Sequence, residues 1–267
     1  MTKEAESRIE GREIFGRVLC GIDGTPESLE ALRQADSLRD PSGRLTVVTA
    51  LELASTAEAG WAATGAAAQL EAAAALALEA ARAEVPGADL RCVEGRADQV
   101  LSAEAERLDA TLVAVGTHGI RRLVGVAIGS VTTMVLREAP CSVLVARARA
   151  EGEEQLGAIV VGVDGSPQSE LAAAVAFQLG ERFGVEVRPV TVGGDGVDRN
   201  AVEAIVPDAV VTEGRPVEAL IASAGRSDLL VIGSRGLAGL RSLGSVSERV
   251  AHRAPCSVLV VRPPARA

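Results

Sequence analysis

The sequence predicts an α/β fold in which two doubly wound parallel five-stranded sheets each carry helices on both faces. Strand-like apolar segments alternate with helix-like segments along the chain, which is typical of parallel sheets with crossover helices. Apolar residues make up 48% of the 267 residues, yet tyrosine is absent and phenylalanine occurs only three times. The core must therefore be aliphatic, which suits a sheet covered on both faces. The same pattern occurs twice, which indicates two similar domains.

The first domain is expected to follow a loose polar segment, residues 1–15. A buried strand over residues 17–22 ends at Asp23, and Thr25 is a good N-cap for a helix that begins at Pro26. That helix is predicted to run to about Arg39. The later strands are predicted at residues 45–51, 90–93, 111–115 and 141–146, and the later helices at residues 65–84, 98–108 and 130–137.

The second half of the chain repeats the first. Residues 159–167 echo residues 18–26, and the seven residues 139–145 recur unchanged at 254–260. Identity of this length, in register with a second match, indicates a tandem duplication. The predicted organisation is a first domain over residues 16–146, a linker over residues 147–157 and a second domain over residues 158–267.

The second copy is shorter than the first by 24 residues between its second strand, residues 186–192, and its third, residues 210–211. We therefore expect no full counterpart of the long alanine-rich helix over residues 65–84. This loss opens one flank of the second domain.

A glycine-punctuated loop follows the fourth strand of each copy. In the first copy Gly116 and Gly119 are followed, after nine residues, by Gly129 and Ser130 at a predicted helix start. A strand, a glycine loop and a helix start aim free backbone N–H groups at a phosphate. Gly116 and Gly119 are expected to allow a positive φ and close approach of a ligand. The alternative is that these glycines only make turns.

Composition and charge exclude several classes of protein. The net charge is −9 and no surface combining basic and aromatic residues is evident, so nucleic acid is not an expected partner. The first residues are charged and lack the apolar region of a signal peptide. The alanine-rich residues 62–83 are interrupted by charges and favour a helix outside the membrane. We expect a cytoplasmic protein with buried, reduced thiols at its four cysteines, Cys20, Cys92, Cys141 and Cys256, and no metal site.

These motifs resemble the universal stress protein family in its tandem two-domain form. The resemblance rests on Gly21-Ile-Asp23-Gly, on the glycine loop with its nine-residue spacer, and on the repeated strand entry, and it covers residues 16–262. It implies sheets ordered 3-2-1-4-5, with ATP at the carboxyl ends of strands one and four. The general rule for open parallel sheets places a ligand at the same point, where strand order reverses.

The resemblance also implies the binding residues. Gly21 and Asp23 would lie beside the nucleoside, Ala50 would offer backbone to the adenine, and Val115 and Gly116 would flank the ribose. The phosphates would be held by Gly119, Gly129, Ser130, Val131 and Thr132. Magnesium or manganese would accompany ATP, held mainly by phosphate oxygens and water. The corresponding residues of the second copy are Asp164, Gly233, Gly236, Gly244, Ser245, Val246 and Ser247.

Several of these residues also have a simpler structural interpretation. Asp23 suits a cap of the turn into the first helix as well as it suits nucleotide binding. His118 and the loop arginines, such as Arg121 and Arg235, are more often solvated side chains than ligands. In the second copy the loop spacer has only seven residues, so its phosphate cradle is expected to be tighter and the first copy is the better site.

The sequence contains no catalytic constellation, so a nucleotide-responsive stress or signalling module with at most incidental ATPase activity is the leading hypothesis. A slow adenine-nucleotide hydrolase is the alternative from the enzyme class. A structural pseudo-dimer that has lost ligand binding in its second half is the third.

The last strand of each copy is apolar and would be a sheet edge, an aggregation hazard unless it is paired. We expect the two last strands to pair antiparallel about a pseudo-twofold axis, with Cys141 and Cys256 too far apart for a disulfide. This internal pairing leaves room for further homo-oligomerisation.

Overall fold

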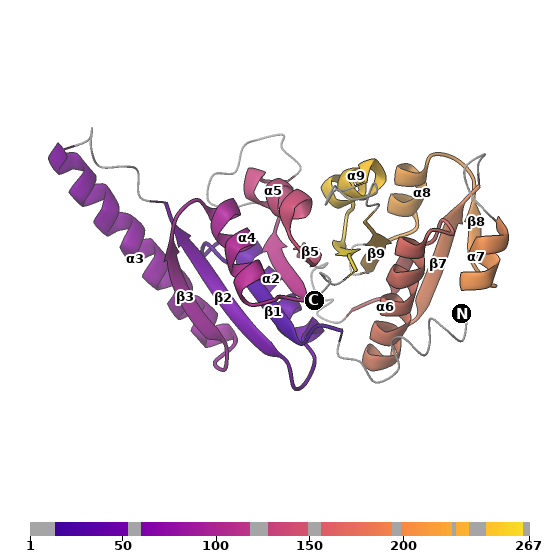
Figure 1. The fold of residues 1–267 in the computed structure, drawn as a ribbon, viewed down its shortest axis with the longest axis horizontal. Coiled ribbons are helices and arrows are strands. Elements are labelled where there is room, and N and C mark those ends of the chain that lie inside the picture. Colours follow the sequence, from indigo (N-terminus) through magenta and orange to yellow (C-terminus); the bar gives the residue numbers. More distant parts are fainter. Residues whose placement is uncertain are drawn as a thin grey trace. The chain divides into compact units, whose positions relative to one another are not determined.

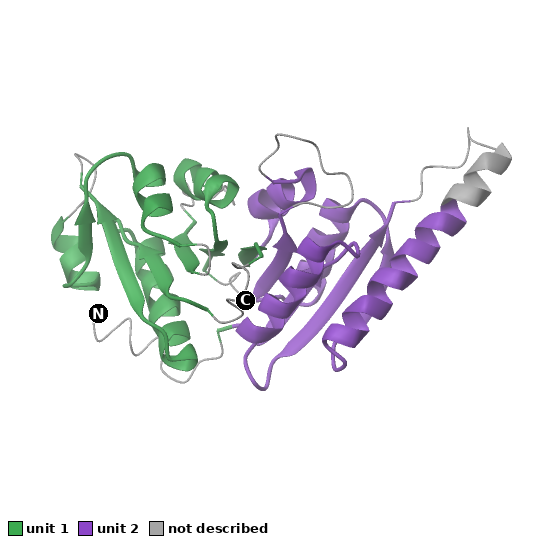
Figure 2. Ribbon diagram, turned by 180° about the vertical axis from the view of Figure 1, so that it is seen from behind, with its two compact units in different colours: residues 1–14, 141–267 green, residues 15–140 purple. Residues whose placement is uncertain are grey.

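The computed structural model describes residues 14–52, 60–117, 128–148, 156–193, 199–225, 228–234 and 244–263. The chain forms two compact units (Figures 1 and 2). We call Phe15–Pro140 the N-terminal unit and Cys141–Ala267 the C-terminal unit. The boundary lies one strand earlier than the boundary between the repeats, because the strand that ends the first repeat pairs inside the C-terminal unit.

The N-terminal unit contains four parallel strands in the order β3-β2-β1-β4. Figure 1 labels β3, β2 and β1. Helix α2 contacts β1, β2 and β4, and helix α3 contacts β2 and β3. Helices α4 and α5 pack together; α4 contacts β1 and β2, and α5 contacts β4. The elements are β1 (Arg17–Gly21), α2 (Pro26–Leu38), β2 (Arg44–Leu51), α3 (Gly60–Glu84), β3 (Asp89–Glu94), α4 (Ala97–Arg107), β4 (Leu112–Gly116) and α5 (Ser130–Glu138).

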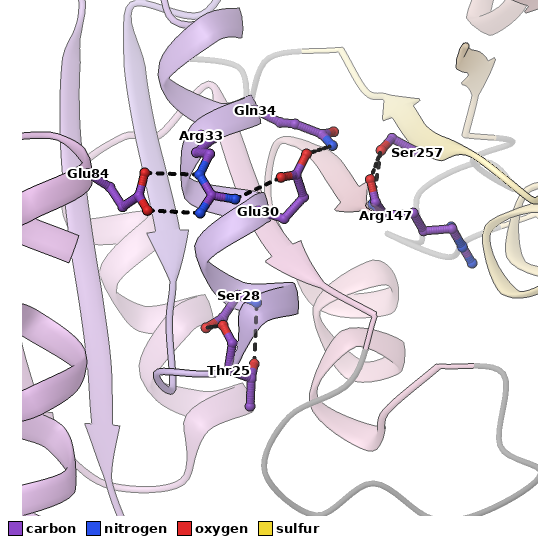
Figure 3. Close-up of polar contacts among 8 residues, drawn as sticks. All are labelled: Thr25, Ser28, Glu30, Arg33, Gln34, Glu84, Arg147 and Ser257. Atoms are coloured by element: carbon purple, nitrogen blue, oxygen red, sulfur yellow. Dashed lines mark hydrogen bonds and ion pairs between the residues drawn. The ribbon is translucent and has the colours of Figure 1, made fainter. Parts of the chain in front are cut away.

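The long helix α3 begins five residues before its predicted start, because alanine sustains a helix without help from a cap. It lies on β2 and β3 through Ala74, Ala77 and Ala81, whose spacing places them on one helical face. Near its C-terminal end, Glu84 accepts two hydrogen bonds from the Arg33 guanidinium, at 2.8 and 2.9 Å (Figure 3). These bonds hold the pKa of Glu84 below its usual value and tie α3 to α2.

The C-terminal unit contains six strands in the order β5-β10-β9-β6-β7-β8. The strands of the second repeat thus follow the predicted order 3-2-1-4-5, and the first four strands of the first repeat follow its first four positions. The elements are β5 (Ser142–Ala146), β6 (Ile159–Gly162), α6 (Pro167–Phe183), β7 (Val187–Val192), α7 (Arg199–Ile205), β8 (Val210–Thr212), α8 (Pro216–Ala222), β9 (Leu229–Gly233), α9 (Ser245–Arg253) and β10 (Ser257–Val261). The short α7 occupies the place in the sequence where the first repeat has α3.

Strands β5 and β10 pair antiparallel, with Leu144 opposite Leu259. The same kind of hydrogen bond, from a backbone N–H to a serine hydroxyl, occurs at both ends of this strand pair. Ser257 Oγ accepts from the backbone N–H of Arg147 at 2.9 Å (Figure 3), and Ser142 Oγ accepts from that of Arg262 at 3.2 Å. The Arg147 guanidinium also donates to the carbonyl of Ala251 at 2.5 Å, near the end of α9, and its burial lowers the Arg147 pKa to about 10.

The core is aliphatic, as expected, and the valine, leucine and isoleucine residues of the central strands are buried. All four cysteines are free. The expectation that all are buried is wrong for Cys92, which is exposed because β3 ends the strand order of its unit. Burial raises the pKa of Cys256 to about 11, which keeps this thiol protonated at neutral pH. In the described part of the chain, no helix is long and apolar enough to cross a membrane.

Candidate functional site at the carboxyl ends of the strands

The carboxyl ends of β1, β2 and β4 meet at one edge of the N-terminal unit's sheet. Strand β1 lies between β2 and β4, so strand order reverses across it. Open parallel sheets bind ligands just outside such a reversal. Four of the predicted binding residues lie at these strand ends, namely Gly21, Ala50, Val115 and Gly116. In the C-terminal unit β6 lies between β7 and β9 and makes an equivalent edge.

Asp23 shapes the turn between β1 and α2. Its Oδ1 accepts from the backbone N–H of Thr25 at 3.1 Å and from the Thr25 hydroxyl at 2.6 Å. Thr25 in turn caps α2 by accepting from the backbone N–H of Ser28 (Figure 3). Asp164 makes the same contacts with Ser166 in the second repeat. The simpler reading of Asp23, as a cap of this turn, therefore describes contacts that are present in both copies.

Gly116 does not have the positive φ that the sequence analysis expected of it. A side chain at this position would instead place its Cβ 2.8 Å from the backbone of Glu27, in the first turn of α2. Gly233 has the same setting, since a Cβ there would lie 2.5 Å from the carbonyl oxygen of Gln168 in α6. The glycine at the end of the fourth strand is thus required by close packing of that strand against the first helix of its repeat.

Thr132 ties the start of α5 to the end of β4. Its hydroxyl is buried and donates to the carbonyl oxygen of Gly116 at 2.7 Å. In the second repeat the Ser247 hydroxyl donates to Gly233 at 2.8 Å. These hydroxyls hold the helix against the strand, so the backbone N–H of Thr132 is the group that remains to be offered to a ligand.

The N-terminus of α5 carries the donors that suit an anion. Gly129 is the N-cap with extended backbone, no side chain caps the helix, and the Gly129 N–H donates to the Thr117 carbonyl at 2.6 Å. The first turn holds Ser130, which is exposed, Val131, which is half-buried, and Thr132. N–H groups in a first helical turn have no intrahelical acceptor, and the helix dipole favours negative charge beside them. Helix α9 begins in the same way with Gly244, Ser245, Val246 and Ser247.

Gly119 and Gly236 lie outside the described residues, as do His118, Arg121 and Arg235. The described part of the chain contains no group of histidine, cysteine, aspartate and glutamate side chains suited to hold a metal ion.

Arg96 was missed by the sequence analysis. It is the N-cap residue of α4, two residues after the end of β3, so it lies at the same edge of the sheet. Its guanidinium pairs with Asp98 at 3.1 Å, and this hydrogen bond raises the pKa of Arg96, with a smaller contribution from Glu52 at the end of β2. The side chain remains 60% exposed, so it can swing toward an anion. The only signal in the sequence is a cation placed between a strand end and a helix start.

Thr132→Val is expected to lower the free energy of unfolding by about 1–3 kcal/mol, because it leaves the buried Gly116 carbonyl without its donor. Thr133→Val is the matched control. The Thr133 hydroxyl donates to the Gly129 carbonyl, which also accepts the backbone N–H of Thr133. Urea unfolding compares the two variants. Equal midpoints would contradict a structural role for the Thr132 hydroxyl.

The universal stress protein family model matches residues 15–147 and 194–262. The stretch between these matches holds most of the linker and then β6, α6 and β7. The internal repeat assigns these three elements to the start of the second copy.

Among curated relatives, a universal stress protein of Mycobacterium tuberculosis is 34% identical over 184 residues, which cover 58% of this chain and 62% of that protein. The match thus spans less than two thirds of that relative's length. A universal stress protein of Thermus aquaticus is 37% identical over 102 residues, covering 37% of this chain and 66% of that protein.

Among solved structures, a universal stress protein from Archaeoglobus fulgidus has the same fold, with a TM-score of 0.69 at 18% identity. That comparison covers 94% of this chain and 97% of the other. A Pseudomonas aeruginosa protein described as functionally unknown gives a TM-score of 0.64 at 16% identity and covers 94% of this chain and 93% of its own. With the family model matching both repeats, the chain belongs to the universal stress protein family, in its tandem two-domain form.

Proposed function

We propose that the chain is a nucleotide-responsive stress or signalling protein that binds ATP at the carboxyl ends of β1 and β4 in the N-terminal unit. The observation that carries the proposal is the start of α5. This helix has no side-chain cap, its first turn begins with an exposed serine, and it lies beside the reversal of strand order. A phosphate is the ligand that such a helix start suits best.

The described residues fit an adenine nucleotide in distinct ways. The N–H groups of the first turn of α5 would receive phosphate oxygens, and the Ser130 hydroxyl would add a donor. The backbone at the end of β2, near Ala50, would accept or donate to the base edge. Magnesium or manganese, bound to the phosphate oxygens and water, would lower the charge repulsion between the phosphates and this acidic protein.

The chain is proposed to bind the nucleotide without rapid turnover. Asp23 and Asp164 each accept two hydrogen bonds in a turn, and the Thr132 and Ser247 hydroxyls are bonded to strand carbonyls. Groups held in this way are poorly placed to take a proton from an attacking water. A slow adenine-nucleotide hydrolase remains the second candidate, and turnover separates the two.

Calorimetric titration with Mg-ATP tests the proposal. We expect a stoichiometry nearer one than two per chain, because the second repeat has a loop spacer of seven residues where the first has nine. Phosphate release in the same samples is expected to stay below about one per second, the low end of typical enzyme rates. Two equal sites would contradict the asymmetry, and the absence of any heat or shift in melting temperature would overturn the proposal.

A further inference from the structure

A second candidate binding site lies at the opposite end of the N-terminal unit's sheet, where the amino ends of β1, β2 and β3 meet. A pocket of about 680 Å³ opens there. This volume lies within the range of small-molecule sites. Its apolar lining comes from Val18, Leu45, Val85 and Leu108. None of the residues predicted to bind nucleotide lines it.

Arginines from three neighbouring strands surround this pocket: Arg17 on β1, Arg44 on β2 and Arg91 on β3. Arg17 and Arg44 are in register on adjacent strands, and like charges in such positions repel one another. Positive charge is therefore gathered at one side of the pocket in a protein whose net charge is −9.

Two of the three guanidinium groups are already paired. Arg17 bonds to the Asp109 carboxylate at 2.6 Å, and Arg91 bonds to Asp89 at 2.6 Å. Within the described ranges, the Arg44 side chain makes no ion pair or hydrogen bond. The C-terminal ends of α2 and α4 lie at this edge and bring partial negative charge. Arg39 and Arg17 also donate to backbone carbonyls in the segments that follow these helices, those of Gly43 and Asp109. Arg44 is thus the cation that remains available.

The second repeat shows that the fold does not require these arginines. Matching the strand registers of the two sheets places Ala158, Glu186 and Val210 at the positions of Arg17, Arg44 and Arg91. The same sheet is therefore built with a small residue, an acid and a valine at these positions. Three cations around the pocket are therefore a feature of the first repeat and not a requirement of the sheet.

We propose that this pocket binds a small organic anion that joins a carboxylate, sulfonate or phosphate group to an apolar body. The anionic group contacts Arg44, and the paired Arg17 and Arg91 add to the positive potential. The apolar body lies against Val18, Leu45 and Val85. A guanidinium group with no other partner gains most from an anion with two oxygens, which it can bind through two parallel hydrogen bonds.

The test uses 1-anilinonaphthalene-8-sulfonate, a fluorescent probe with this chemistry, titrated into the full chain. Arg44→Glu is expected to weaken its binding by about tenfold or more, the loss of a hydrogen-bonded ion pair. Arg82→Glu is the matched control, because it makes the same change of charge at an exposed site on α3 outside the pocket. It should leave the affinity within about twofold. Octanoate should displace the probe, and octanol, which lacks the charge, should not.

Equal affinity of the wild type and Arg44→Glu would overturn the proposal, and so would equal losses in Arg44→Glu and Arg82→Glu. Because the probe also binds exposed apolar surface, circular dichroism and melting curves first establish that each variant is folded. Arg44→Gln, which removes the charge without reversing it, is expected to give an intermediate loss. Mg-ATP is not expected to compete with the probe, since its proposed site is at the other end of the strands. Failure here would leave the nucleotide proposal intact.

Discussion

Ser130→Pro is expected to weaken ATP binding by about tenfold or more while α5 stays folded. Proline removes both the hydroxyl and the backbone N–H of the first residue in the helix, and each hydrogen bond to a charged group contributes about 1.5–3 kcal/mol. That N–H has no intrahelical acceptor, so the helix itself loses nothing.

The backbone of this chain is already compatible with the substitution. The residue before a proline must be extended, and Gly129 has φ −71° and ψ 164°. Thr25 and Ser166 have nearly the same angles, and each precedes a proline at the start of α2 or α6. The variant therefore reproduces the kind of helix start that α2 and α6 already have.

Two controls separate the contributions. Ser130→Ala removes only the hydroxyl and is expected to cost less affinity than Ser130→Pro. Ser245→Pro makes the equivalent change at α9, where Gly244 is also extended, and is expected to have little effect if the first repeat holds the main site. Calorimetry with Mg-ATP gives all three affinities. If Ser130→Pro binds as tightly as the wild type, α5 does not hold the phosphates.

Much of the fold could be predicted because local signals agreed with one another. The Thr25 cap, Pro26 and the apolar strands each point to the same alternation, and the exact repeat at residues 139–145 and 254–260 fixed the duplication. Element boundaries were less certain at α3, since an alanine-rich helix contains no residue that marks its start. The pairing of β5 with β10 could be predicted because an apolar strand at a sheet edge would be exposed if it had no partner.

The sequence predicted which residues make up the candidate site, but it did not predict which groups each of them contacts. The closeness of Gly116 to α2 depends on helix packing that no local pattern encodes. Asp228 shows the same limit. It accepts from the backbone N–H groups of Ala158 and Gly225 and pairs with Arg188, so its role exists only once these segments meet. In the first repeat the equivalent Thr111 accepts from the Arg17 N–H, and no sequence rule links the two.

Gly233→Ala is expected to lower the free energy of unfolding by about 3 kcal/mol or more, a large cost for one methyl group. The new Cβ would lie 2.5 Å from the Gln168 carbonyl oxygen and 2.6 Å from its carbon. Both are backbone atoms in the first turn of α6, so relief requires the helix to move away from β9. A helix shifted in this way loses the packing of its buried alanines on the sheet.

Gly116→Ala meets the Glu27 backbone at 2.8 Å, so it is expected to destabilise the N-terminal unit by a smaller amount, about 1–3 kcal/mol. Gly87→Ala is the control, because a Cβ there has no neighbour within 4 Å, and its unfolding is expected to change by less than about 1 kcal/mol. Urea unfolding followed by circular dichroism ranks the three variants. If Gly233→Ala unfolds at the same urea concentration as Gly87→Ala, close packing does not explain the glycine at the end of the fourth strand. The ligand-binding role first predicted for Gly116 would then be the better account of both positions.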